Sequence, residues 1–368
     1  METPIRDIVR GDGTPVSKPF VSVIVPLFNA ANYVETSLKS ICDQSFCDFE
    51  LIVIDDGSTD NSRNLVQQFN DDRIRLFTNE VNLGPAASRN RAIDMARGNY
   101  IAFFDADDLA SSNRLSQQIE FLSRNPSIGI VGSHVEVIQS DGTKSGEVWG
   151  YDGRSDHIGP TMLFRNCLAT STLLIRAEVI GQKRFRTDIP VASDYEFWTR
   201  LLRDHSAHVL PENLVQYRVH PANLSHSKQS LTENCLRQIA DLQLRHMGLN
   251  PSNDELTLHR QVSCGLERSR AFVDAAESWL IQLRNANGTS KRFDQRPLDQ
   301  VLAQCWRDLC WNTSSLGVWT WNRYRKSPLR LMASSSARHE FRFCCRIVRG
   351  ALKKSIPRVS SSLRRGGV

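Results

Sequence analysis

The chain has 368 residues, of which 40% are hydrophobic and 23% are charged, and its formal net charge at pH 7 is +6. This length can bury a large core in about two domains, and the composition excludes a disordered, collagen-like or disulfide-stapled chain. No run approaches the roughly 20 apolar residues of a membrane-spanning helix, and residues 1–13 lack the apolar core of a secretory signal. The nine scattered cysteines indicate reduced thiols, as in a cytoplasmic protein.

Strands and helices are expected to alternate after a flexible leader, residues 1–18. Residues 21–27, VSVIVPL, form a continuous apolar run that is typical of a buried parallel strand. The same reasoning predicts strands at residues 50–54, 74–77 and 100–104, and helices at 32–44, 61–69 and 85–98. This alternation predicts right-handed crossovers and an α/β fold with a mostly parallel sheet and flanking helices.

The middle of the chain has a less regular pattern. A helix is expected around residues 115–122, strands at 128–138, 169–175 and 208–219, a turn at 140–142, and a short helix at 194–202. From residue 227 the sequence becomes helical, with breaks expected near residues 250–253 and 285–296. We therefore expect a helical region at residues 227–319 and a basic tail at 320–368.

Polar residues follow three of the predicted strands: Asn29, the pair Asp55 and Asp56, and the acidic run from Asp105 to Asp108. In open α/β sheets, ligands bind beyond the carboxyl ends of the parallel strands. The sequence therefore predicts one polar site at this edge of the sheet.

The acidic run suits a divalent cation. Asp105 and Asp107 are two residues apart at a strand end, so their carboxylates point to one side. Such a pair can hold a hard cation that also takes phosphate oxygens. The alternative is a solvated turn, and Asp108 could simply cap the next loop.

Two other clusters point to a nucleotide. Asp55 or Asp56 can accept hydrogen bonds from a nucleobase or a ribose hydroxyl, although Ser58 and Asp60 could instead cap the following helix. Arg89 lies early in a helix that begins at a Gly-Pro turn, where both the helix dipole and the guanidinium favour phosphate. The alternative for Arg89 is a surface ion pair.

The segments VSVIVPLFNA, ELIVIDDGSTD, NLGPAASRN and YIAFFDADD, in this order, resemble the family 2 glycosyltransferases. The resemblance continues through SDYEFWTRLL and YRVHPANLS and covers residues 20–225. It implies a GT-A fold at residues 19–226. It also implies inverting transfer of a sugar from a nucleotide-sugar, a UDP-sugar by this likeness, to a hydroxyl acceptor in cell-surface glycan synthesis.

The resemblance also assigns residues. It implies that the nucleotide-sugar is bound by Pro26, Phe28, Asn29, Asp55, Asp56, Asn82, Arg89 and Asp105. It implies that Asp105, Asp107 and His220 hold Mn²⁺ or Mg²⁺, although His220 could equally be a loop histidine beside Pro221. Asp194 matches the general base, with Ser193 in place of the glutamate that usually precedes it.

Other functions fit less well. A nucleotidyltransferase or a dehydrogenase would need a Gly-rich loop after the first strand, and PLFNAANY has none. An inactive sugar-nucleotide-binding or membrane-tethered scaffold remains an alternative, against which Asp105, Asp107 and Asp194 argue. Sugar specificity is expected to depend on residues 140–170, where Trp149 could stack on a sugar or belong to the core; Tyr151 and His157 lie in the same segment.

The C-terminal end is strongly basic. From Thr320 onward there are 13 lysines and arginines against one acidic residue, Glu340. Four tryptophans precede or enter this segment: Trp306, Trp311, Trp319 and Trp321. Basic residues beside tryptophan predict peripheral binding to an anionic membrane on the cytoplasmic face. The family resemblance, and not this segment, implies a glycan or lipid-linked acceptor, which such binding would suit. The alternative is a packed helical tail with a solvated basic face. Nucleic acid is not expected, because no zinc, helix-turn-helix or RNA-binding motif is present.

Overall fold

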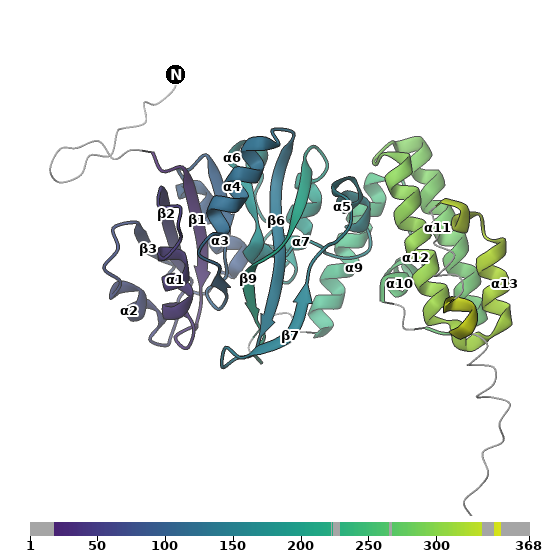
Figure 1. Ribbon diagram of the computed structural model, residues 1–368, viewed down its shortest axis with the longest axis horizontal. Coiled ribbons are helices and arrows are strands. Elements are labelled where there is room, and N and C mark those ends of the chain that lie inside the picture. The colour runs from purple at the N-terminus through teal and green to yellow at the C-terminus, as the bar shows by residue number, and fades with distance from the viewer. Residues whose placement is uncertain (1–17, 222, 224–228, 265–266, 333–341, 347–368) are drawn as a thin grey trace, which may run out of the picture. The chain divides into compact units, whose positions relative to one another are not determined.

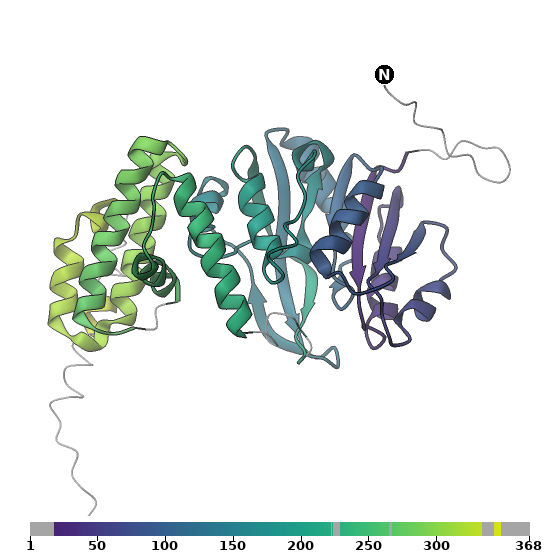
Figure 2. The same ribbon diagram turned by 180° about the vertical axis from the view of Figure 1, so that it is seen from behind.

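The computed structural model describes residues 18–221, 223, 229–264, 267–332 and 342–346, so the expected leader lies outside the described residues. The chain divides into two compact units. Unit 1 comprises residues up to 162 together with 166–239, and unit 2 comprises residues 163–165 and the chain from residue 240. Figures 1 and 2 show the sheet of unit 1 and the helices of unit 2 from opposite sides.

The first half of unit 1 is the predicted crossover fold. Four strands pair in parallel in the order β3-β2-β1-β4: β1 (Val21–Leu27), β2 (Phe49–Asp55), β3 (Ile74–Thr78) and β4 (Tyr100–Phe103). They are joined by α1 (Val34–Cys42), α2 (Ser62–Gln67) and α3 (Pro85–Met95). The predicted strands and helices of this half are confirmed, and the carboxyl ends of the four strands lie at one edge.

The sheet continues in the order β4-β8-β6-β9-β5, and β7 pairs with β6 beside this path. These elements are β5 (Leu109–Ala110), α4 (Arg114–Arg124), β6 (Ile128–Ile138), β7 (Lys144–Trp149), α5 (Ser155–Thr161), β8 (Leu174–Arg176), α6 (Ala177–Ile180), α7 (Ser193–Leu201) and β9 (Ser206–Arg218). β6 and β9 form a long parallel pair, whereas β8 runs antiparallel to β4 and β6. The pattern missed β7 because all six of its residues are exposed and show no apolar alternation.

The strand expected at residues 169–175 is wrong in its first half. Residues 170–172 form a 3-10 turn, η1 (Thr170–Thr172), and only the short β8 follows. The turn is stabilised by local hydrogen bonds, from the Thr172 amide to the Ala169 carbonyl and from the Leu173 amide to the Thr170 carbonyl. Apolarity alone could not distinguish such a buried turn from a strand.

The sheet is buried on both faces, as its continuous apolar strands require. Val21, Val23 and Val25 of β1 belong to one core cluster with residues of α1 and α4, among them Leu38 and Leu115. On the opposite face α3 packs against β1 and β2, and Phe103 of β4 meets Trp198 of α7 with ring centroids 5.2 Å apart. α3 and α7 are therefore fixed on the same face of the sheet, next to its polar edge.

Unit 2 is helical, as expected. It contains the second half of α9 (Gln229–His246), then α10 (Asn253–Cys264), α11 (Arg270–Ser290), α12 (Gln295–Asn312), η2 (Ser314–Leu316), α13 (Val318–Lys326) and η3 (Pro328–Met332). Figure 1 shows α11, α12 and α13 side by side. The division expected at residue 320 falls inside α13, where Thr320 and Tyr324 are buried, and Phe343 is fully buried in the same core. The described part of the expected tail is therefore a part of this helical core.

The structure corrects the expected role of the tryptophans. Trp306 is fully buried in the core of unit 2, and three more pack against that core while partly exposed: Trp311, Trp319 and Trp321. Their large apolar rings fill the space between helices, which leaves Arg325 and Lys326 exposed on α13. Most of the basic tail lies outside the described residues. No helix within the described ranges is long and apolar enough to cross a membrane.

Candidate functional site

The loops that follow β1 and β2 are tied together. Asn29 adopts a left-handed backbone conformation (φ 48°), which asparagine tolerates better than most residues. Its amide nitrogen donates to Ser58 Oγ at 3.0 Å, and its side-chain oxygen accepts from the Thr59 amide at 2.8 Å. Phe28 beside it is 46% exposed, so an aromatic face borders this loop junction. Pro26 precedes both residues within β1 and is half-buried.

The helix-capping alternative for the second loop is only partly met. Asp60 accepts from the Ser62 amide at 2.9 Å at the start of α2, but Ser58 is taken up by Asn29. Asp60 also accepts from the Ala31 amide at 3.0 Å. These side chains therefore hold the β1 loop as well as the helix.

Asp56 is buried and organises the loop after β3. Its Oδ1 accepts from Asn79 Nδ2 at 2.6 Å and from the Leu83 amide at 3.0 Å, and its Oδ2 accepts from the Gly84 amide at 2.7 Å. Asn82 is exposed in the same loop. Asp55 is buried too and accepts from the Ser58 amide at 3.1 Å. Both carboxylates thus fix the shape of the edge.

The chain passes very close to itself at this point. Gly57 has a positive φ of 73°, and a Cβ at this position would lie 3.0 Å from the backbone of Val81. Only glycine combines that conformation with that space.

Arg89 and Asp105 form an ion pair between α3 and the end of β4. Arg89 Nη2 lies 2.7 Å from Asp105 Oδ1, and Arg89 is only 8% exposed, with its guanidinium over the ring of Phe185. The ion pair considered for Arg89 is thus present, but its guanidinium is buried and only the Asp105 carboxylate is partly exposed. Such a pair fixes the carboxylate in one position, because breaking it would leave a charge without a partner.

Asp107 and His220 meet although they are far apart in the sequence. His220 Nε2 lies 2.9 Å from Asp107 Oδ2, and the imidazole packs on Tyr33 with centroids 4.8 Å apart. Asn223 holds this loop by accepting from the His220 amide at 2.6 Å. Within the described residues, no group of three or more His, Cys, Asp or Glu side chains is close enough to hold a metal ion.

Asp108 is a buried carboxylate at the same strand end. Burial, and then repulsion from Asp107 and Asp105, raise its pKa well above the usual range. The Arg218 amide donates to Asp108 Oδ1 at 2.9 Å, and Arg218 Nε donates to the Asp107 carbonyl at 2.8 Å. The sequence analysis missed Arg218, although it lies within the segment YRVHPANLS.

Asp194 is the second residue of α7. The helix begins directly after Ala192, which has a positive φ of 59°. Its Oδ2 accepts a hydrogen bond from Thr170 Oγ1 at 2.7 Å. Ser171, the next residue of η1, accepts at its Oγ from the Asp105 amide at 3.2 Å. One short turn therefore contacts both the end of β4 and the carboxylate on α7, and neither Thr170 nor Ser171 was singled out from the sequence.

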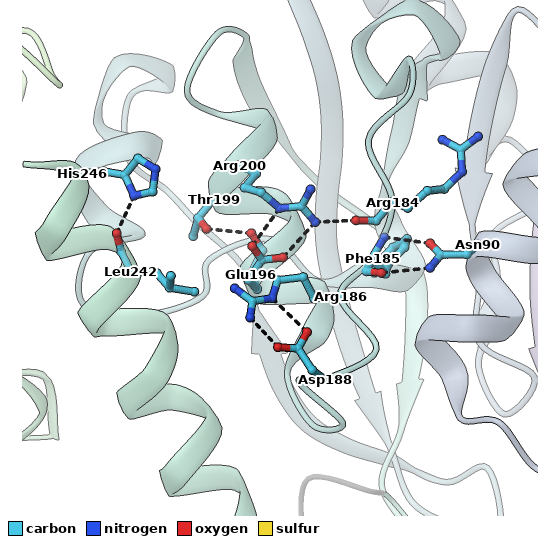
Figure 3. A network of polar contacts seen from close by, with 10 residues as sticks. All are labelled: Asn90, Arg184, Phe185, Arg186, Asp188, Glu196, Thr199, Arg200, Leu242 and His246. Atoms are coloured by element: carbon cyan, nitrogen blue, oxygen red, sulfur yellow. Dashed lines mark hydrogen bonds and ion pairs between the residues drawn. The ribbon is translucent and has the colours of Figure 1, made fainter.

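A network of polar contacts ties α3 and α7 to the segment around residues 184–185, as Figure 3 shows. Asn90, next to Arg89 on α3, binds both the amide (2.7 Å) and the carbonyl (2.9 Å) of Phe185. On α7, Glu196 pairs with Arg200, whose Nη2 donates to the Arg184 carbonyl at 2.5 Å. The segment between the two helices is therefore held from both sides.

The aromatic residues expected to affect sugar specificity differ in exposure. Trp149 on β7 is 46% exposed and lies beside Tyr217, with centroids 5.3 Å apart. Tyr151 is buried, and His157 in α5 is half-buried. Trp149 is thus not a core residue.

Comparisons with known proteins agree with this architecture. The family model described as "Glycosyl transferase family 2" matches residues 22–180. The putative teichuronic acid biosynthesis glycosyltransferase TuaG of Bacillus subtilis is 34% identical over 221 residues, which are 57% of this chain and 83% of that protein. The UDP-Glc:alpha-D-GlcNAc-diphosphoundecaprenol beta-1,3-glucosyltransferase WfgD of Escherichia coli is 30% identical over 211 residues, covering 56% and 80%.

Among solved structures, Staphylococcus aureus TarS 1-349 in complex with UDP-GlcNAc is similar in fold. The TM-score is 0.51 at 17% identity, and 91% of each chain is covered. The fold is thus of the GT-A type, and the chain belongs to glycosyltransferase family 2. It is a glycosyltransferase, as the sequence motifs predict.

Proposed function

We propose that this protein is an inverting glycosyltransferase that transfers a sugar from a UDP-sugar to a hydroxyl group of a cell-surface glycan or its lipid-linked precursor. One observation carries the proposal: η1 contacts both the end of β4, through the Asp105 amide, and the Asp194 carboxylate. The chain end of β4 at Asp105, on the donor side, and the separate carboxylate of Asp194 are therefore held at one edge of the sheet. Transfer to a hydroxyl acceptor requires such an arrangement.

In this proposal Asp194 is the general base. It accepts the proton of the acceptor hydroxyl while that oxygen attacks the anomeric carbon and the bond to the diphosphate breaks. A single displacement inverts the anomeric configuration. A retaining double displacement would need a second positioned nucleophile, for which no residue was singled out.

We propose that a divalent cation binds at the other end of the site. Asp107 Oδ2 and His220 Nε2 are 2.9 Å apart, and carboxylate oxygens suit Mn²⁺ or Mg²⁺. Asp105, Asp107 and His220 would hold the ion after moving closer together, because no three such side chains among the described residues lie close enough to hold it as they stand. When bound, it would offset the negative charge that grows on the leaving diphosphate.

The remaining predicted residues line the nucleotide side. Phe28, Asn29 and Asn82 are on exposed loops that can meet the nucleoside, and Pro26 shapes the start of the first loop. Asp56 is buried and already accepts hydrogen bonds from three donors, so we assign it the role of holding the Leu83 and Gly84 amides. Asp55 would likewise hold the second loop by accepting from the Ser58 amide, and Arg89 would hold the carboxylate of Asp105.

The names of two relatives support the donor and acceptor classes. WfgD is named for a UDP-glucose donor and a diphosphoundecaprenol-linked acceptor, and TuaG for teichuronic acid biosynthesis. By analogy we propose a UDP-sugar donor and a lipid-linked or cell-surface acceptor for this protein.

We also propose that the protein binds the cytoplasmic face of an anionic membrane. The support is the charge at the end of the chain, with Arg325 and Lys326 exposed on α13, and no longer the tryptophans. Such binding would bring the site to a lipid-linked acceptor.

Calorimetry with UDP, with and without Mn²⁺, tests the metal and donor parts of the proposal. Asp107→Asn is expected to lose the Mn²⁺-dependent part of UDP affinity and to remain folded, because the amide is isosteric but is a poor ligand for the cation. Asp43→Asn, at an exposed aspartate that follows the last residue of α1, is the matched control. Unchanged Mn²⁺-dependent affinity in Asp107→Asn would remove Asp107 from the metal site. A protein that binds UDP but releases none from any UDP-sugar would instead be the inactive scaffold.

A further inference from the structure

The turn η1 is held firmly from the interior of unit 1. Gln118 Nε2 of α4 donates to the Thr172 carbonyl at 2.6 Å, and Arg114 Nη2 donates to the Leu173 carbonyl at 3.3 Å. Both side chains are completely buried. A buried turn with its carbonyls bound in this way cannot move without breaking several hydrogen bonds at once.

Two hydroxyl groups project from this turn in different directions. Ser171 Oγ takes the Asp105 amide, and Thr170 Oγ1 donates to Asp194 Oδ2 at 2.7 Å. Thr170 is 7% exposed, and its β-branched side chain has few rotamers. The hydroxyl therefore meets the carboxylate from a fixed point that is shared with the donor-side strand end.

We propose that Thr170 is the positioning residue of the catalytic base. This inference rests on the proposed function, in which Asp194 is that base. By occupying Oδ2, Thr170 orients the carboxylate and leaves Oδ1, which has no hydrogen-bond partner among the described residues, to accept the proton of the acceptor hydroxyl. The proton moves to Oδ1 as the acceptor oxygen bonds the anomeric carbon and the sugar–diphosphate bond breaks.

The physical basis is the short hydrogen bond to an ionised group. A hydroxyl that donates to a carboxylate restrains both side-chain torsions of the aspartate, and a hydrogen bond to a charged group is roughly twice as strong as one between neutral groups. Without it, the carboxylate on the first turn of α7 would sample other rotamers, and fewer of them would be aligned with the acceptor. The loss would fall on turnover and not on nucleotide binding.

The experiment compares five variants of the full chain. Thr170→Val removes the hydroxyl at constant shape, and Thr170→Ser keeps it. Thr199→Val is the matched control, since Thr199 is a buried threonine on α7 whose hydroxyl, among the described residues, bonds only the Glu196 carbonyl of its own helix, at 2.7 Å. Asp194→Asn and the double variant Asp194→Asn/Thr170→Val complete a mutant cycle. The readouts are UDP release from UDP-glucose and UDP-GlcNAc with Mn²⁺, UDP affinity by calorimetry, and thermal unfolding.

Thr170→Val is expected to lower kcat by about 10- to 100-fold while UDP affinity stays within about twofold. Thr170→Ser should recover most of the turnover, and Thr199→Val should stay within about threefold of the wild type. In the Asp194→Asn background, Thr170→Val should change turnover by less than about threefold, because both changes remove one function.

Each contrary result has a distinct meaning. Wild-type turnover in Thr170→Val, or an equal loss in both backgrounds, overturns the positioning role while leaving Asp194 as the base. Near-normal turnover in Asp194→Asn overturns the base assignment itself. A wild type that binds no UDP and releases none from either donor overturns the proposed UDP-sugar donor, and the positioning role of Thr170 falls with it.

Discussion

The polar edge of unit 1 and the helical core of unit 2 accommodate their interior side chains in different ways. At the edge, Asp56 is buried and accepts from the Gly84 amide of another loop, and the partly exposed Asp105 pairs with Arg89 of α3. In unit 2 the core cluster is apolar and aromatic, and beside it lie buried polar groups such as His259, which is bound to the Leu163 carbonyl and to Trp279. Hydrogen-bond partners need particular residues at particular positions, whereas volume can be filled by many sequences. The difference explains why the edge carries recognisable motifs and the helical core does not.

The largest expected effect is at the polar edge, where the substitution removes the carboxylate oxygen that would accept the proton. Asp194→Asn should reduce turnover by about 10²–10⁴-fold while UDP affinity is kept, because a general base acts on the acceptor and not on the nucleotide. UDP release at saturating donor, together with calorimetry, measures the two effects separately. A variant with nearly normal turnover would contradict the role of Asp194 and would blur the contrast between the two regions.

In unit 2 the expected effect of a single substitution is on stability. Trp306→Ala removes a fully buried indole from the core and should cost about 3–5 kcal/mol of unfolding free energy. Val318→Ala, at a residue that is 59% exposed on α13, is the control and should change stability by no more than about 0.5 kcal/mol. Chemical denaturation measures both. Equal, small effects would mean that the helical core tolerates a cavity, which the packing argument does not allow.

Acid should weaken unit 2 through the buried side chain of His259. Burial lowers the pKa of His259 to about 4, so between about pH 6.5 and 4 the unfolded chain binds a proton that the folded unit does not. The contribution of neutral His259 to the free energy of unfolding is therefore fully present above pH 6.5, and up to about 3 kcal/mol of it is lost as the pH drops to 4.

Glu50 in unit 1 behaves differently. Burial would raise its pKa, but hydrogen bonds from Ser22, Arg97 and Arg75 lower it, so its contribution is lost only below its unfolded value of 4.5. Thermal unfolding at pH 7, 6 and 5 should show an early loss that His259→Gln reduces. An identical pH dependence in that variant would exclude His259 as the cause.

The smallest expected effect concerns the charged surfaces of the two units. Arg325→Gln/Lys326→Gln should weaken binding to vesicles with anionic lipid at low salt by roughly 1 kcal/mol per residue. Arg63→Gln/Arg124→Gln removes the same charge from exposed positions of unit 1 and should have little effect. Co-sedimentation at two salt concentrations measures both. Equal losses in the two variants would show that net charge, and not α13, governs any binding.

The strand–helix alternation, the polar strand ends and the family could all be predicted from the sequence. Long apolar runs such as residues 21–27 and acidic pairs such as Asp105 and Asp107 have a local cause, since burial of a parallel strand and the geometry of its end act over a few residues. The sequence also predicted that the last third is helical, but it did not predict where the helical core ends. The core of unit 2 extends past residue 319 and includes α13 and Phe343.

Only the tertiary structure decided which partners the site residues have. It paired Asp107 with His220, Arg89 with Asp105 and Thr170 with Asp194, across separations that no local pattern encodes. It also buried Trp306 in the core and packed three partly exposed tryptophans against it, where the sequence left both a membrane surface and a packed helical tail open. Local propensity fixes which residues form strands and helices, but the partner of a buried polar or aromatic side chain is chosen by the packing of the whole sheet or helix bundle.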